Sequence, residues 1–266
     1  MTQDELLQGV VIPVDKPRQW TSFQAVNKIK AAIRRTFDLK KFKIGHAGTL
    51  DPLASGLLLV CVGKATKRID ELQSGTKVYS GTFVFGATTP CYDLERPIDS
   101  YYPFAHISPA LLQSALPQFL GTVQQVPPIF SAVKIDGQRA YQYARQTTAD
   151  EPAPMPTPKP VQIYDFEITA FRPGDPAATP PPLVQTDLAD ARHLYDNPLG
   201  TVPQHLPQAD FRIRCGKGTY IRSIARDLGL ALNSGAFLSA LRREQVGQYH
   251  LADAVSLDEV ERFLLS

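Results

Sequence analysis

The 266-residue sequence contains few cysteines, methionines and tryptophans, with three, two and one of them respectively. No Cys-x-x-Cys pair occurs among Cys61, Cys91 and Cys215, so neither a disulfide framework nor a metal site is predicted. No apolar run approaches the roughly 20 residues that span a membrane, and the N-terminal residues lack the features of a secretory signal. We therefore expect a cytoplasmic globular protein with reduced cysteines.

Excess charge is also small, because 28 basic and 26 acidic residues give a net charge of +2. Residues 173–210 hold five aspartates and one arginine, so the rest of the chain carries +6. Seven basic residues and one acidic residue fall between Lys28 and Lys43. This distribution is a modest electrostatic footprint for a polyanion. A solvated helix face and a solvated loop explain it equally well.

The most informative stretch is residues 45–67, where a short loop containing His46 and Asp51 precedes a wholly apolar run. Such a run predicts a strand or helix that is buried on most sides. A carboxylate held against buried structure by a loop rich in Gly and Pro is a common way to build a site. In the alternative interpretation Asp51 only caps a turn and His46 only fills a gap. For the whole stretch we favour a functional site.

Apolar periodicity elsewhere predicts strands and helices of uneven length. Strands are expected at residues 9–14, 77–86, 161–171 and 211–215. Helices are expected after Thr21 and after Gly218. The first helix should bury one face, formed by Phe23, Val26, Ile29, Ile33 and Phe37. Because the pattern has no strict βαβ rhythm, it indicates an α+β fold.

Two segments interrupt this pattern. Residues 125–145 combine adjacent prolines and an Asp-Gly turn with interleaved basic and aromatic side chains, namely Lys134, Arg139, Tyr141, Tyr143 and Arg145. Such side chains suit contact with RNA phosphates and bases, although an ordinary surface hairpin followed by a helix is the alternative. Residues 172–208 are rich in Pro and acidic, and we interpret them as an insertion between strands.

A partly buried Asp51 would need a cationic partner, because an unpaired buried charge is costly. Arg222 is the candidate, since it lies at the start of a helix that follows a strand and a Gly-Lys-Gly turn. A paired arginine would keep the carboxylate ionised and oriented. Alternatively, Arg222 is a surface residue of an amphipathic helix. These residues alone therefore predict a site, but no reaction.

Four segments occur in order along the chain: GHAGTLDPLASGLLLVCVGKATK, KVYSGTFVFGATT, QQVPPIFSAVKIDGQRAYQYAR and GKGTYIRSIARDLG. Together they closely resemble the TruB family of tRNA pseudouridine synthases, over residues 9–252. The resemblance implies an α+β pseudouridine synthase fold, in which helices flank a central mixed, mostly antiparallel sheet. It also implies the isomerisation of uridine 55 in the T-loop of tRNA to pseudouridine. Residues 125–150 would form the family's RNA-gripping insertion.

The resemblance assigns catalytic roles to three residues. Asp51 matches the essential aspartate, which acts either as a nucleophile or as an electrostatic and proton-handling group on the ribose. Tyr79 matches the tyrosine that stacks on the target base. Arg222 matches the arginine that pairs with the aspartate. No metal or organic cofactor is expected.

Further residues are expected to bind the substrate, a tRNA T-arm whose target base is flipped into the pocket. His46 and Tyr220 match residues that contact the RNA, and Leu241 matches an apolar residue of the pocket. Additional RNA contacts are expected from Lys64, Lys134, Arg139 and Tyr141. We expect a monomer that needs no protein partner.

The chain also departs from the family pattern. The family motif DKPxGxTS is here Asp-Lys-Pro-Arg-Gln-Trp-Thr-Ser, with Gln19 where Gly is usual, which puts the local turn in doubt. The insertion at 172–208 is long for the family. We expect residues 1–266 to form a single catalytic domain without the C-terminal PUA domain of many bacterial members, and hence to depend less on the acceptor-stem end of tRNA.

Two other functions are compatible with some of these residues. A non-catalytic chaperone that binds tRNA with the same surface would not need the trio of Asp51, Tyr79 and Arg222. A small-molecule glycosidase that uses Asp51 would lack an evident second carboxylic acid, and the basic, aromatic segment would be unexplained.

Overall fold

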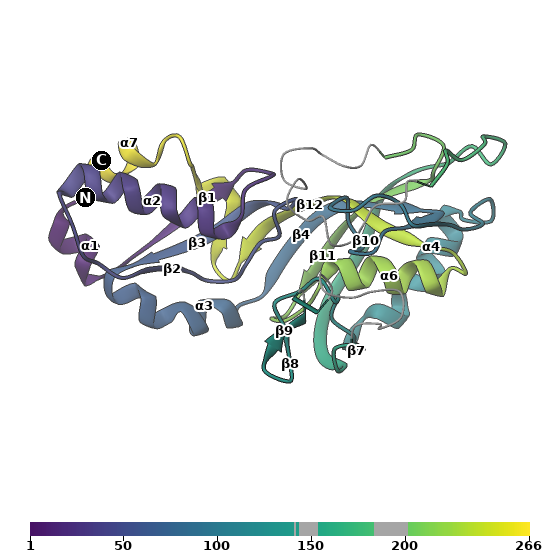
Figure 1. The fold of residues 1–266 in the computed structure, drawn as a ribbon, viewed down its shortest axis with the longest axis horizontal. Helices are drawn as coiled ribbons and strands as arrows, with labels where there is room; N and C mark the ends of the chain where they lie inside the picture. Colours follow the sequence, from purple (N-terminus) through teal and green to yellow (C-terminus); the bar gives the residue numbers. More distant parts are fainter. Residues whose placement is uncertain (141, 144–153, 184–201) are drawn as a thin grey trace. The chain divides into compact units, whose positions relative to one another are not determined.

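The computed structural model describes residues 1–140, 142–143, 154–183 and 202–266. The chain forms two compact units, of which the first contains residues 1–80 and 241–266 and the second contains residues 81–240. Strands β4 (Lys77–Phe85) and β12 (Ala236–Val246) contribute residues to both units. Figure 1 labels the main helices and strands. The expectation of a single domain stays a prediction.

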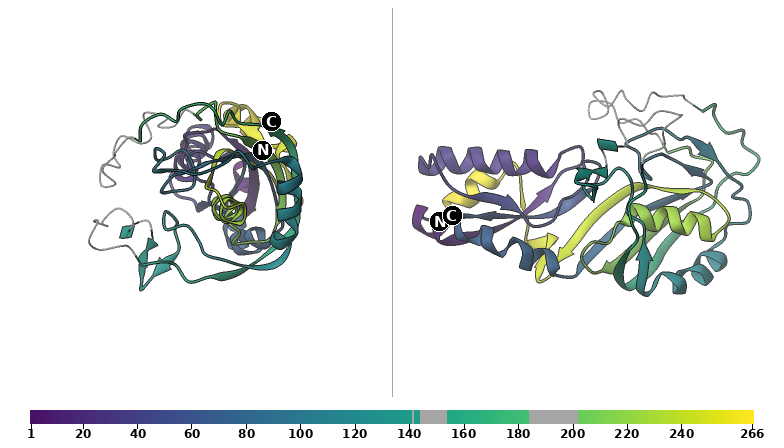
Figure 2. Two further views of the ribbon diagram at one scale, coloured as in Figure 1. Left: turned by 90° about the vertical axis from the view of Figure 1, so that its right-hand side faces the viewer. Right: turned by 60° about the horizontal axis from the view of Figure 1, so that its bottom comes forward.

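The first unit contains both termini, which lie side by side (Figures 1 and 2). Besides its parts of β4 and β12, its elements are α1 (Gln3–Gly9), β1 (Val10–Lys16), α2 (Ser22–Phe37), β2 (Ile44–His46), β3 (Ser55–Val62), η1 (Gly63–Arg68), α3 (Ile69–Ser74), β13 (Tyr249–His250), η4 (Leu251–Asp253), β14 (Val255–Ser256) and α7 (Val260–Leu265).

Strand β3 is the apolar run of the sequence, and all its residues but Ser55 are buried. It pairs antiparallel with β1 along the whole of β1, from Val10↔Val62 to Lys16↔Gly56. It also pairs antiparallel with β2 and parallel with β12, while β14 pairs parallel with β1. The sheet of this unit is therefore mixed, and its most buried strand directly follows the loop that carries Asp51.

Helix α2 begins where the sequence predicts, with Thr21 and Gln24 forming a capping box. Ile29 and Ile33 are fully buried, and the helix packs against α7. The expectation that Phe23 joins this buried face is wrong, because its side chain is 69% exposed. Phe23 is the second residue of the helix, and periodicity defines a helix face without defining how far along the axis that face is covered.

The second unit contains, besides its parts of β4 and β12, the elements β5 (Ala87–Thr88), β6 (Ser100–Tyr101), α4 (Pro109–Ala115), η2 (Leu116–Phe119), β7 (Gly121–Gln125), β8 (Lys134–Ile135), β9 (Gln138–Arg139), β10 (Lys159–Arg172), β11 (Gln208–Cys215) and α6 (Ile221–Ala231).

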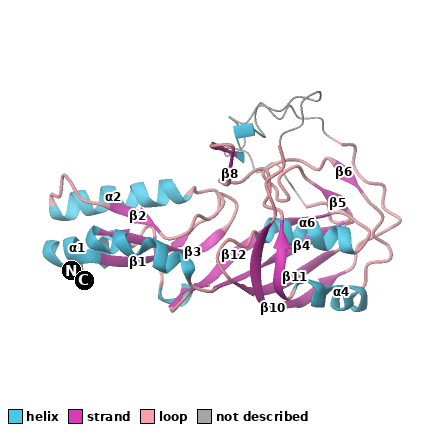
Figure 3. Ribbon diagram, turned by 90° about the horizontal axis from the view of Figure 1, so that it is seen from below, coloured by secondary structure: helices cyan, strands magenta, loops and turns pink. Residues whose placement is uncertain are grey.

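Neighbouring strands of the second unit follow the order β12-β4-β11-β10-β7. Strand β10 pairs antiparallel with β11 and β7. Figure 3 shows α4 and α6 beside these strands. The rings of Phe83 and Phe211 stack at 4.0 Å between centroids in the core, and α6 buries Ile221, Ile224 and Leu228. The expected strands and the late helix are confirmed, as is the α+β class with a mixed, mostly antiparallel sheet.

The short strands β8 and β9 form a hairpin that extends away from the other strands of its unit (Figure 2). Its turn consists of Asp136 and Gly137, both with positive φ, as in a type I′ turn. The Asp-Gly turn expected from the sequence is thus confirmed. Tyr141 and Arg145 lie outside the described residues, as do parts of the two proposed insertions at 125–150 and 172–208.

Candidate active site

The loop that carries Asp51 connects β2 with β3 and is fixed by its backbone. The Ser22 hydroxyl donates to the carbonyl of Leu50 at 3.1 Å and accepts from the Leu50 amide at 2.9 Å. The amide of Ala54 donates to the carbonyl of Asp51 at 3.1 Å. Asp51 itself is half-buried. The backbone on both sides of Asp51 is thus anchored, and the function of its side chain stays a prediction.

A buried lysine lies next to this loop. The side chain of Lys16, at the end of β1, is 0% exposed. Its ammonium donates to the carbonyls of Trp20 at 2.6 Å and Pro17 at 2.9 Å, with the carbonyl of Pro52 at 3.5 Å. A buried ammonium needs such acceptors to offset the loss of water. Lys16 thus joins the segment after β1 to the residue that follows Asp51.

A buried arginine holds the other side of the loop. Arg243, on β12, is 2% exposed. Its guanidinium donates to the carbonyls of Leu57 at 2.8 Å, Gly48 at 3.0 Å and Thr49 at 3.4 Å. The planar fork of arginine can reach several acceptors at once, which a lysine cannot do in the same way. Sequence analysis quoted Lys16 within the Asp-Lys-Pro motif without assigning it a role, and it missed Arg243.

These two cations set the electrostatics around Asp51. The pKa of Lys16 is lowered to about 8, chiefly because burial disfavours the charged ammonium, while the negative charge of Asp51 acts to raise it. The positive charge of Arg243 lowers the pKa of Lys16 further. Burial and then the charge of Arg243 also lower the pKa of His46, which favours the neutral imidazole at neutral pH. The carboxylate of Asp51 and the ammonium of Lys16 therefore interact electrostatically.

The other expected residues of the first unit lie on its strands. His46 is half-buried on β2 and pairs with Val60 of β3. Tyr79 is 9% exposed on β4, and Leu241 is half-buried on β12. The structure thus places His46 and Asp51 in one unit, and the charge of Arg243 acts on His46. The roles of all four side chains stay predictions.

Arg222 lies in the second unit, in the first turn of α6, and is only 4% exposed. The alternative that it is a surface residue is therefore wrong. Its guanidinium donates to the carbonyls of Phe130 at 2.9 Å and Cys91 at 3.2 Å, and its Nε lies 3.7 Å from Oδ2 of Asp93. Asp93, which sequence analysis did not single out, is thus an ion-pair partner of Arg222. The pairing of Arg222 with Asp51 stays a prediction.

The start of α6 is held by a buried glutamine instead of a capping side chain. Gln125, 3% exposed, accepts from the amide of Tyr220 at 2.8 Å and donates to its carbonyl at 3.2 Å. Ser223 and Arg226 both donate to the carbonyl of Val126. The segment after β7 therefore positions the first turn of α6, including the predicted substrate contact Tyr220.

The expected RNA contacts on the surface are exposed. Lys64 reaches only the side chain of Gln8, at 2.6 Å between Nζ and Oε1, among the contacts of the described residues. Lys134 and Arg139 are cross-strand partners in the β8–β9 hairpin. Two like charges directly opposite each other are unfavourable unless an anion binds between them. Their contact with RNA stays a prediction, and the fourth residue of this group, Tyr141, lies outside the described residues.

In the described part of the chain, no cluster of three or more His, Cys, Asp or Glu side chains is arranged to bind a metal ion. Within the same residues, every helix is too short or too polar to span a bilayer.

Two family models match the chain. The model described as TruB family pseudouridylate synthase (N terminal domain) matches residues 34–179, and the model described as tRNA pseudouridylate synthase B C-terminal domain matches residues 222–266. The chain is 46% identical over 265 residues to the tRNA pseudouridine synthase B of Flavobacterium johnsoniae, covering 99% of this chain and 100% of that protein. It is 43% identical over 257 residues to the protein of the same name from Phocaeicola vulgatus, covering 97% and 94%.

Among solved structures, the chain is similar to one in the crystal structure of a Cbf5-Nop10-Gar1 complex. The TM-score is 0.63 at 23% identity, and the match covers 99% of this chain and 57% of that chain. A second similarity, to a structure of an H/ACA RNP bound to a substrate RNA containing 2′-deoxyuridine, has a TM-score of 0.57 at 21% identity, with 99% and 56% covered. The chain thus spans little more than half the length of these structural relatives, and at such identities the likeness concerns the fold alone.

Proposed function

Because the chain belongs to the TruB family of pseudouridylate synthases, we propose that it isomerises uridine 55 in the T-loop of tRNA to pseudouridine. The coarser activity, tRNA pseudouridine synthesis, rests on relatives of that name that are 41–46% identical over nearly the whole chain. In the reaction the N1–C1′ bond breaks, the uracil rotates and a C5–C1′ bond forms. C5 loses its proton and N1 gains one, so the overall change is an isomerisation that needs no co-reactant.

Asp51 is the residue that we propose to act on the ribose. A carboxylate near C1′ either bonds to it or stabilises the positive charge that develops there as the glycosidic bond breaks. The single observation that carries this proposal is the anchoring of the Asp51 loop by the buried cations Lys16 and Arg243. A preorganised carboxylate loses little free energy on orientation during the reaction. Both roles of Asp51 fit this arrangement.

The remaining site residues act around this carboxylate. We propose that Tyr79 stacks on the uracil and that Leu241 closes the apolar side of the pocket. Arg222 is proposed to pair with Asp51 and keep it ionised. In the structure its guanidinium is oriented by the carbonyls of Cys91 and Phe130 and by the carboxylate of Asp93.

The substrate is proposed to be the T-arm of tRNA, with the target base flipped out of its loop at a cost of a few kcal/mol. His46 and Tyr220 would contact the RNA near the flipped nucleotide. Lys134 and Arg139 of the β8–β9 hairpin, together with Lys64, would contact phosphates. We infer that the protein acts in the cytoplasm as a monomer without an obligatory protein partner. Sedimentation of the purified protein, alone and with tRNA, tests whether it is a monomer.

The direct test is mapping of pseudouridine in an unmodified tRNA transcript incubated with the purified protein. We expect one new pseudouridine, at position 55, and none in a transcript with cytidine there. Asp51→Asn should abolish the product while tRNA binding changes by only a few-fold. Asp70→Asn, which removes an exposed carboxylate from the first turn of α3, is the matched control.

The outcomes separate the hypotheses. Retained turnover by Asp51→Asn would refute the role of Asp51. Tight tRNA binding by the wild-type protein without any pseudouridine would favour the non-catalytic chaperone instead.

A further inference from the structure

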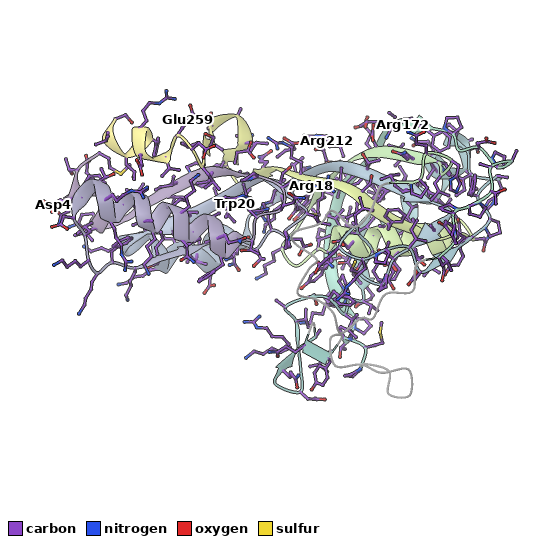
Figure 4. The ribbon with its side chains drawn as sticks, turned by 45° about the horizontal axis from the view of Figure 1, so that its top comes forward. Asp4, Arg18, Trp20, Arg172, Arg212 and Glu259 are labelled. Atoms are coloured by element: carbon purple, nitrogen blue, oxygen red, sulfur yellow. The ribbon has the colours of Figure 1, made fainter. Side chains whose placement is uncertain are left out.

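The segment at residues 17–23 leads from β1 into α2 and has no role in the proposed reaction. It presents two exposed side chains, Arg18 and Phe23, and the single tryptophan of the chain, the half-buried Trp20. Figure 4 labels Arg18 and Trp20, which lie on either side of Gln19. An arginine and two large aromatic residues therefore fall within six residues of one another, at the end of the connection and in the first turn of α2.

This segment is tied to the Asp51 loop by backbone contacts. The amide of Gln19 donates to the carbonyl of Pro52 at 2.8 Å. The buried ammonium of Lys16 holds the carbonyls of Pro17 and Trp20 and lies 3.5 Å from that of Pro52. The positions of Arg18 and Trp20 are therefore coupled to the residue that follows the proposed catalytic carboxylate.

The backbone of the segment is strained at its centre. Gln19 has φ of +68°, in the left-handed region that residues with a Cβ rarely adopt. Such strain persists only where the surrounding structure imposes it, and it is concentrated at functional sites. Here the Gln19–Pro52 hydrogen bond and the buried Lys16 impose it. This turn is therefore imposed by contacts with the Asp51 loop.

The charges and rings of the segment are largely unused within the protein. Arg18 makes no ion pair with any residue that the structure describes. Phe23 is 69% exposed, more than any other aromatic residue among those described. Trp20 carries the ammonium of Lys28 over its ring, 5.5 Å from the centroid. An exposed guanidinium and exposed aromatic side chains in one short segment are the residue types that bind the phosphates and unpaired bases of single-stranded RNA.

We propose that residues 17–23 bind the RNA strand next to the target nucleotide, with Arg18 on a backbone phosphate and the rings of Phe23 and Trp20 against unpaired loop bases. This inference rests on the proposed function, because the Asp51 loop defines where the target nucleotide lies. The segment would then select an open RNA loop and hold it while the base is flipped. It is a substrate-binding element and not part of the chemistry.

The test compares Arg18→Ala and Phe23→Ala with two controls, Arg212→Ala and Leu265→Ala. Arg212 is an exposed arginine on β11 (Figure 4), and Leu265 is an exposed apolar residue of α7. All four side chains are exposed, so the variants should fold. The dissociation constant for an isolated T-arm stem-loop is measured at several salt concentrations, and the single-turnover rate is measured with saturating enzyme.

We expect Arg18→Ala and Phe23→Ala each to raise the dissociation constant about tenfold, which is in the range found for the loss of one base stack or one phosphate contact. Arg18→Ala should also reduce the salt dependence by about one phosphate contact. Saturated single-turnover rates should stay within about twofold of wild type, and the controls should bind normally. If Arg18 or Phe23 were instead needed to maintain the structure of the site, its replacement would also lower the single-turnover rate at saturating enzyme.

Three results would overturn the proposal. The first is that Arg18→Ala and Phe23→Ala both bind the stem-loop as tightly as the wild-type protein, which itself forms pseudouridine. In that case the proposed function would stand and only this inference would fail. The second is an equal loss in Arg212→Ala, which would indicate only a general charge effect. The third is a dimer that Phe23→Ala dissociates without affecting RNA binding. If the wild-type protein forms no pseudouridine at all, the proposed function fails before this question arises.

Discussion

Replacing Arg243 by methionine tests whether the Asp51 loop is held by the buried guanidinium. Methionine fills a similar volume but donates no hydrogen bond. The change leaves the carbonyls of Leu57 and Gly48, at 2.8 and 3.0 Å from the guanidinium, without this donor. An unsatisfied buried acceptor costs about 1–3 kcal/mol. Because methionine also avoids the cost of burying a charge, we expect the free energy of unfolding to fall by about 2–4 kcal/mol.

The same substitution has an electrostatic consequence of known sign. The charge of Arg243 is one cause of the lowered pKa values of His46 and Lys16, so its removal should raise both. Burial remains and is the larger cause, so the pKa of His46 should rise but stay below its ordinary value. Arg243→Lys keeps the charge without the fork, and it should therefore leave the pKa of His46 low while still destabilising the loop.

Urea denaturation, followed by circular dichroism and by the fluorescence of the single tryptophan, measures the free energy of unfolding of each variant. An NMR titration of the imidazole of His46 measures its pKa. A loss below about 1 kcal/mol in Arg243→Met would contradict the argument from unsatisfied carbonyls. An unchanged pKa of His46 in that variant would contradict the electrostatic one. Pseudouridine formation should fall in Arg243→Met and recover only partly in Arg243→Lys.

Two further predictions concern other buried polar groups. The activity of the wild-type enzyme should fall as pH rises through about 8, because Lys16 then loses the positive charge that interacts with Asp51. Lys16→Arg should move this fall in activity to higher pH. Between about pH 8 and 10.5, the folded protein has released the proton of Lys16 whereas the unfolded chain still binds it. The free energy of unfolding of the wild type should therefore rise with pH over this range, relative to that of Lys16→Met. Gln125→Ala should lower the free energy of unfolding by about 1–3 kcal/mol by leaving the buried backbone of Tyr220 unpaired. Gln125→Glu keeps the acceptor but places a buried carboxylate against the carbonyl of Tyr220, so at neutral pH it should destabilise the protein at least as much as Gln125→Ala does, as chemical denaturation can check.

Much of the fold was predictable because apolar periodicity reports which faces are buried. The strand expected at 77–86 is found as Lys77–Phe85, and the helix expected after Gly218 buries its apolar side chains in the expected register. The error at Phe23 has a physical cause. Periodicity describes a helix as if its whole length were covered, whereas the first turn of α2 carries an exposed phenylalanine.

The candidate site was predictable only in part. Asp51 stood out because an acidic residue in a Gly- and Pro-rich loop before an apolar strand is locally unusual. Lys16, Arg243 and Gln125 did not stand out, since lysine, arginine and glutamine are mostly surface residues and composition assigns them to solvent. Their function depends on which backbone carbonyls lie beside them, and that depends on pairing between distant strands.

The register of β3 and β12 shows how that pairing creates the site. Gly56 follows the Asp51 loop with φ of +101°, and a Cβ there would lie 2.4 Å from the carbonyl oxygen of Arg243. The glycine therefore permits the close approach that pairs it with Arg243. This approach in turn lets the guanidinium reach carbonyls almost 200 residues earlier in the chain. The loop around Asp51 consequently reaches its final form only when β12 has joined the sheet, because the guanidinium that holds the carbonyls of Gly48 and Thr49 comes from that strand.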